Sequence, residues 1–202
     1  MGSASIYSRI SKSMVEIKVH VKGEPIIRCG VIVVCKASSA YIIADTRELG
    51  EYVGMKRITV DFPDQQTSSH NQFFDHNGLL GIQCRLRKQF DHNKVSAVEF
   101  DEEALKSLDA VYVYEGVKDI ITPGNVTQCG THMFSVTNDA SALSEFGAPI
   151  LNKNGMFVGM CDSFGYHLSG RTILAIAETL EGSQNRTFTN VQGALDHLYD
   201  TI

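Results

Sequence analysis

The chain consists mainly of short runs in which apolar and polar residues alternate. From position 14 to 21, valine and isoleucine fill the odd positions and polar residues follow each of them, which is the period of a half-buried strand. Gly23-Glu24-Pro25 predicts a turn into a second strand rich in β-branched residues. Similar runs predict strands at 26–35, 41–44, 58–62, 79–86, 95–100 and 111–114. The polar stretch 63–77 lacks this period and predicts a long surface loop.

A second set of short strands begins after Pro123-Gly124. Within it, Asn152-Lys153-Asn154-Gly155 predicts a tight hairpin, because Asn and Gly tolerate a positive φ. The expected strands are 133–136, 149–151, 156–160 and 172–177. The tail differs, because Thr189 and Gln192 form a capping box and the apolar residues after them repeat at helical spacing. The pattern therefore predicts an all-β chain that ends in one amphipathic helix.

Composition narrows the possible classes of protein. The 202 residues are 43% apolar, enough to bury a sizeable core, and the net charge is −5. Lys and Arg are scattered, so no nucleic-acid partner is expected, and no apolar stretch approaches the roughly 18 residues of a membrane span. The start of the chain carries no signal-peptide core, and five cysteines without a C-x-x-C pair suit reduced thiols in the cytoplasm or nucleus. No metal spacing or phosphate loop is present, so neither a metal nor a cofactor is expected.

Two neighbouring stretches of the second half point to a known family. Phe146 to Gly159 reads F-G-A-P-I-L-N-K-N-G-M-F-V-G, and Thr137-Asn138-Asp139-Ala140 precedes it. The first stretch resembles, without a gap, the S-G-G-P-L-V-N-x-x-G-x-V-I-G nucleophile segment of trypsin-like serine proteases, especially of the Do-like, or high-temperature-requirement, branch. The second resembles the T-D-A-A of that branch, and 172–176 resembles its G-F-A-I strand. More loosely, 31–47 and 98–113 resemble the stretches that carry its catalytic histidine and aspartate.

The resemblance implies an all-β fold of two six-stranded antiparallel β-barrels of chymotrypsin type, with a C-terminal α-helix. It predicts a flexible N-terminus at 1–12, an N-terminal barrel at 13–118, a C-terminal barrel at 119–188, and a helix at 189–202 packed on the barrels.

The catalytic positions of the family are altered in this chain. A serine hydrolase needs a hydroxyl nucleophile, an imidazole base and a carboxylate that orients the imidazole. In the register of the resemblance, Phe146 stands at the nucleophile position and Arg47 at the histidine position, and only Asp109 is retained. Ser144 replaces the oxyanion-hole glycine. Phenylalanine has no nucleophilic atom and a guanidinium stays protonated, so the sequence predicts a pseudoprotease and not an enzyme.

Asp109 has two interpretations. It is either a relic of the triad, ion-paired with Arg47 across the former cleft while Phe146 plugs the site, or a carboxylate that begins a strand and accepts backbone hydrogen bonds.

Three functional hypotheses follow from these residues. In the first, the fold is an inactive scaffold that binds a protein or an extended peptide, which the family cleft accepts as an added strand; Phe73 and Phe74 are candidate anchors. In the second, the chain is an active serine or cysteine hydrolase with a displaced nucleophile and base, drawn from Ser144, Cys129, His20 and His132. In the third, it is a regulatory partner of an active homologue in a mixed oligomer.

Overall fold

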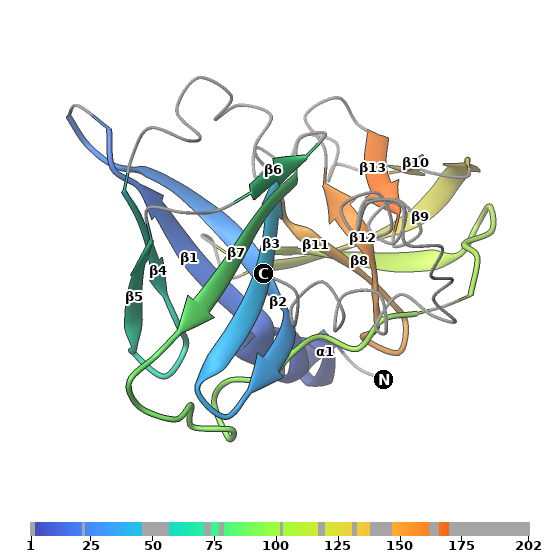
Figure 1. Cartoon of the computed structure of the whole chain (residues 1–202). Helices are drawn as coiled ribbons and strands as arrows, with labels where there is room; N and C mark the ends of the chain where they lie inside the picture. Colours follow the sequence, from blue (N-terminus) through green and yellow to red (C-terminus); the bar gives the residue numbers. More distant parts are fainter. Residues whose placement is uncertain are drawn as a thin grey trace, which may run out of the picture.

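The computed structural model describes residues 3–21, 23–45, 57–70, 74–76, 79–101, 103–116, 120–130, 133–137, 147–161 and 166–169. The chain forms two curled antiparallel sheets, one from each half of the sequence (Figure 1). None of the helices in these ranges has the length and apolar character that a membrane crossing requires.

The first sheet has seven strands in the order β5-β4-β1-β2-β3-β7-β6, and every neighbouring pair is antiparallel. Strands β5 and β7 contact each other, so the sheet curls back on itself. The sheet is one of the two antiparallel sheets expected, and its described residues form seven strand segments, of which β6 is the shortest. The strands are β1 (Met14–Val19), β2 (Ile26–Lys36), β3 (Ser39–Asp45), β4 (Ile58–Asp61), β5 (Thr67–His70), β6 (Phe74–His76) and β7 (Leu79–Arg85).

The second sheet is a closed six-stranded barrel in the order β10-β13-β12-β11-β8-β9. The Asn152–Gly155 hairpin joins β11 to β12 as predicted, and Gly155 has a φ of 79° there. Its strands are β8 (Ala110–Glu115), β9 (Ile120–Cys129), β10 (Met133–Thr137), β11 (Pro149–Asn152), β12 (Phe157–Cys161) and β13 (Tyr166–Ser169).

Strand β2 explains how the two sheets are joined. Its central run is continuously apolar because both of its faces are buried. Ile32 packs into the core of the first sheet, while Val31 and Val33 face a separate cluster that also contains Leu151 and Phe157 of the second barrel. This shared cluster fixes the two sheets against each other.

The N-terminal segment completes the shared cluster. Helix α1 (Ser3–Ile10) is followed by a short 3-10 turn, and it places Ile6 and Ile10 in that cluster with 0% and 2% exposure. The flexible N-terminus expected for 1–12 is thus replaced by a docked helix from Ser3 onward, because these two isoleucines lie one turn apart on one helix face.

Other boundaries also differ from expectation. Strand β8 pairs with β9 and β11 in the second barrel, so the division expected at residue 118 falls before Ala110 instead. The loop expected at 63–77 contains the short strands β5 and β6. The strand expected at 95–100 makes only one bridge, Phe100 to Phe157, because it crosses between the sheets. The expected strand at 172–177 and helix at 189–202 lie outside the described residues.

Candidate functional site

The segment that resembles the nucleophile loop enters β11 through a left-handed glycine. Gly147 has a φ of 82°, a conformation that glycine adopts at little cost. Its N–H donates to the carbonyl of Cys161 at 3.2 Å, and the Cys161 N–H donates to the buried Ala148 at 2.8 Å. These bonds fix the turn against the end of β12. Phe146, which directly precedes the turn, and Ser144 lie outside the described residues.

The segment that resembles the histidine loop follows β3. Strand β3 is buried at Tyr41, Ile42 and Ala44 and ends at Asp45, which pairs with Leu79 of β7. Arg47 comes two residues after this pair and lies outside the described residues. The ion pair predicted between Arg47 and Asp109 therefore stays a prediction.

Asp109 has a clear local role at the start of β8. Its carboxylate accepts the Lys106 N–H at 2.7 Å, and its own N–H donates to the Lys106 carbonyl at 3.1 Å. The Asp109 carbonyl accepts the N–H of Val126 from β9 at 2.9 Å. These contacts are those of a carboxylate that closes a turn and begins a strand, the second interpretation of Asp109.

The register of β8 and β11 separates Asp109 from the nucleophile turn. The pairs Val111–Asn152 and Val113–Ile150 place Asp109 beyond the Asn152 end of β11, while Gly147 precedes its other end. The five residue steps from Gly147 to Asn152 correspond to about 16 Å of extended chain. A triad carboxylate must reach its imidazole within hydrogen-bond distance, and no contact within the described ranges links Asp109 to the turn at Gly147.

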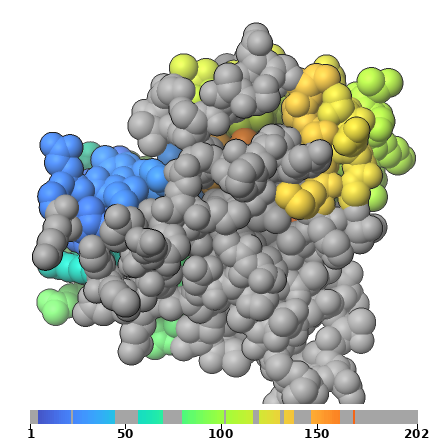
Figure 2. All heavy atoms as spheres, turned by 90° about the horizontal axis from the view of Figure 1, so that it is seen from above, coloured from blue at the N-terminus to red at the C-terminus, as the bar shows by residue number. Residues whose placement is uncertain are grey.

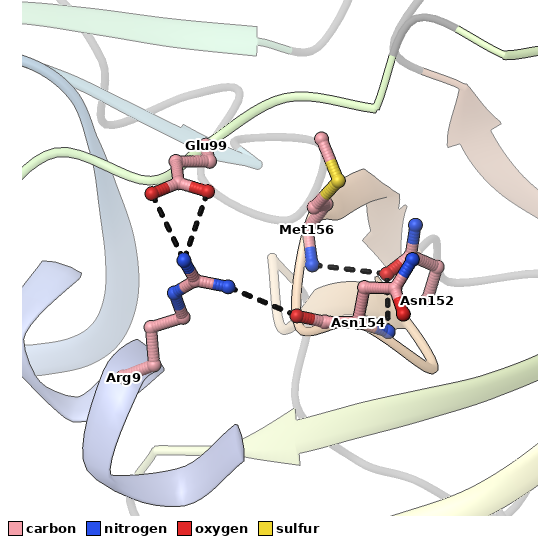
Figure 3. A network of polar contacts seen from close by, with 5 residues as sticks. All are labelled: Arg9, Glu99, Asn152, Asn154 and Met156. Atoms are coloured by element: carbon pink, nitrogen blue, oxygen red, sulfur yellow. Dashed lines mark hydrogen bonds and ion pairs between the residues drawn. The ribbon is translucent and has the colours of Figure 1, made fainter. Parts of the chain in front are cut away.

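Asp109 instead lines a polar pocket of about 360 Å³ together with the β11–β12 hairpin. The hairpin is organised by Asn152, whose Oδ1 accepts the N–H groups of Asn154 at 2.8 Å and Met156 at 3.0 Å (Figure 3). From α1, Arg9 donates to the Asn154 carbonyl and to both carboxylate oxygens of Glu99, each at 3.0 Å (Figure 3). The hairpin end of the second barrel is thus tied to the N-terminal helix.

Glu115 is a residue that the sequence reasoning missed. It is only 3% exposed and accepts a hydrogen bond from the Thr122 hydroxyl at 3.4 Å. The pairing of Val113 with Ile150 puts Glu115 at the same end of β11 as Gly147. The alternation of β8 could have predicted the burial of Glu115, because Val111 and Val113 face the barrel core and Glu115 lies on the same face of the strand.

Of the displaced groups considered for a hydrolase, Cys129 and His20 lie among the described residues. Burial raises the pKa of Cys129, and the negative charge of Asp109 raises it further, whereas a nucleophilic cysteine needs a lowered pKa. His20 lies after β1 in the first sheet, and its Nε2 is 2.7 Å from the Thr59 hydroxyl. His132 and Phe73 lie outside the described residues, and Phe74 opens strand β6. Nowhere in the described ranges do three His, Cys, Asp or Glu side chains gather as metal ligands.

The double-sheet architecture is a chymotrypsin-like double-barrel fold, and similar solved structures share it. One is the serine endoprotease from Yersinia pestis, with a TM-score of 0.65 and 14% identity over 89% of this chain and 66% of that chain. Another is Deg5, with a TM-score of 0.61 and 15% identity over 85% of this chain and 90% of that chain. No family model and no curated protein sequence matches the chain. The similarity confirms the predicted fold.

Proposed function

We propose that the chain is a catalytically inactive homologue of the trypsin-like proteases that binds an extended peptide segment of a partner protein. One observation supports the proposed loss of activity. The left-handed turn at Gly147, which leads into β11, is immediately preceded in the sequence by Phe146. The family resemblance puts the nucleophile at that position, and a phenyl ring cannot attack a carbonyl. Arg47 at the histidine position removes the base as well.

The frame that would hold a ligand does not depend on catalytic residues. The two sheets share one buried cluster, and α1 closes it with Ile6 and Ile10. A fold held in this way keeps its shape when the nucleophile and the base are replaced, because its rigidity comes from close packing.

Strand β6 offers a place for the added strand. In the described part of the first sheet, β6 (Phe74–His76) is the last strand on its side and pairs only with β7. An edge strand presents unpaired backbone N–H and C=O groups, to which an extended peptide can add. Phe74 begins this edge, and we propose it as an anchor for the bound peptide.

The test is to incubate the protein with a library of extended peptides and to analyse the bound and free fractions by mass spectrometry. We expect bound peptides to be recovered intact, and Phe74→Ala to weaken their binding. Ile27→Ala is the matched control, because Ile27 is a 40% exposed apolar residue on β2, and it should bind like the wild type. Cleaved peptides that accumulate with time would support the hydrolase instead, and a failure to retain any peptide would contradict the scaffold.

A further inference from the structure

Leu108 combines two unusual properties. It is 83% exposed, the most exposed large apolar side chain in the described ranges, and its φ is 74°. A left-handed backbone is uncommon for any residue other than glycine and is unfavourable for a side chain that branches like leucine. Gln65, with a φ of 66°, is the other non-glycine residue with a positive φ in these ranges, and it carries a polar side chain.

The turn around Leu108 is held by hydrogen bonds that do not involve the Leu108 side chain. The Leu108 N–H donates to the Val126 carbonyl of β9 at 2.7 Å, and the Ser107 hydroxyl donates to the Thr127 carbonyl at 3.3 Å. Asp109 closes the turn through Lys106. The fold therefore holds an apolar side chain in solvent in a strained conformation, and such a site invites a functional explanation.

On the β9 side of Leu108, the neighbouring strand residues are small and uncharged, whereas on its other side Leu108 lines a pocket with charged residues, among them Asp101, Glu103, Lys106, Asp109 and Lys153. Strand pairing places Ala110 next to Asn125, and Asn125 next to Thr137. The hydroxyls of Thr127 and Ser135 lie 2.7 Å apart in the same outer layer. We call these five residues the neutral platform. Glu115 is the one charged residue in strands β8–β13, and it is buried. Figure 2 shows atoms of β9 and β10, coloured yellow, on the surface beside green atoms of the preceding segment.

We propose that Leu108 and the neutral platform form a self-association interface between two copies of this chain. The net charge of −5 makes copies repel each other through their charged faces, and the neutral platform is free of that repulsion. Interface cores are depleted in charged residues and surrounded by a polar rim. Here Lys106 and Glu103, both exposed, line one pocket with Leu108. In a two-fold dimer, Lys106 of each copy can face Glu103 of the other copy. Each Leu108 then packs on the neutral platform of the other copy.

This inference does not depend on the residue at the nucleophile position, because Leu108 lies near the Asn152 end of β11 and Gly147 precedes the other end. The test is sedimentation across a dilution series of the wild type and of Leu108→Asn. Asparagine tolerates the left-handed conformation, so Leu108→Asn should leave Tm unchanged or raise it by up to about 4 °C. It should also weaken self-association about tenfold or more, because the interface loses the burial of a leucine side chain.

Gln65→Asn is the matched control, since it changes the other left-handed residue and leaves the neutral platform intact. It should shift Tm in the same direction as Leu108→Asn and dimerise like the wild type. The proposal is overturned if the wild type stays monomeric at every concentration. It is equally overturned if Leu108→Asn dimerises as tightly as the wild type, or if Gln65→Asn weakens association as much as Leu108→Asn does.

Discussion

Truncation of Ile6 tests whether the N-terminal helix is a structural part of the fold. Ile6 is fully buried in the cluster that the two sheets share. Ile6→Ala removes three carbon atoms, and each buried methylene contributes about 0.8 kcal/mol to the free energy of unfolding. The transfer contribution is therefore about 2.4 kcal/mol, and the cavity left between two sheets that cannot collapse raises the expected loss to about 3 kcal/mol.

Arg9→Ala is the control at a solvent-exposed position one turn further along the same helix. Its side chain is 44% exposed and pairs with Glu99, which is 61% exposed, so its removal should cost at most about 1 kcal/mol. The measurement is equilibrium denaturation in urea for the wild type and both variants. In a thermal scan, Ile6→Ala should lower Tm by about 6–12 °C. If Ile6→Ala costs no more than Arg9→Ala, the helix is not part of the folded core and the reasoning is refuted.

Two further predictions concern titrating groups. Burial alone would raise the pKa of Asp61, but the hydrogen bonds from Lys18 and Thr67 lower it. The ionised Asp61 therefore stabilises the folded state above the ordinary carboxyl pKa, and this contribution is lost as the pH falls through the lowered pKa of Asp61. Asp61→Asn should therefore cost about 1 kcal/mol at neutral pH and nothing well below pH 4; a cost independent of pH in urea titrations would argue against this ion pair. Cys129 is the exposed cysteine of the five, so it should react first with a thiol reagent. Asp109→Asn should accelerate the labelling of Cys129, because it removes the negative charge that helps to raise the pKa of this thiol. Burial raises the pKa of Cys84 to about 12. If Cys84 is labelled as fast as Cys129, both the burial of Cys84 and the predicted order of labelling are wrong.

Much of the strand framework could be predicted because alternation follows directly from burial of one face. The strands expected at 14–21, 58–62 and 79–86 correspond to β1, β4 and β7 with boundaries shifted by one or two residues at their C-terminal ends. Strand β9 was missed since Pro123-Gly124 is typical of a turn, yet both residues pair with β8. Short elements such as α1 and β6 have too few residues to show a period, and their formation depends on packing and pairing with distant segments.

The candidate site was predictable only where it rests on local sequence. The turn at Gly147 follows from the F-G-A-P motif, because a left-handed glycine is a local property of the chain. The assignment of Asp109 as the triad carboxylate rested on a looser match to the family. In addition, the end of a strand at which a residue lies depends on the pairing register with distant strands. The pairing of β8 with β11 sets Asp109 far from Gly147 and brings Glu115 to that end instead. No pattern within the 98–113 segment encodes that register.

The proposed inactivity rests on Phe146, a chemically inert residue at the nucleophile position of the family resemblance. The most direct measurement is the rate at which a serine-reactive fluorophosphonate labels the native protein, compared with the same protein unfolded in urea. We predict that native labelling is no faster than labelling of the unfolded chain, because the proposed loss of the base leaves no serine activated. Rapid labelling that requires the native fold, at Ser144 or any other serine, would show a working nucleophile and contradict the proposed inactivity.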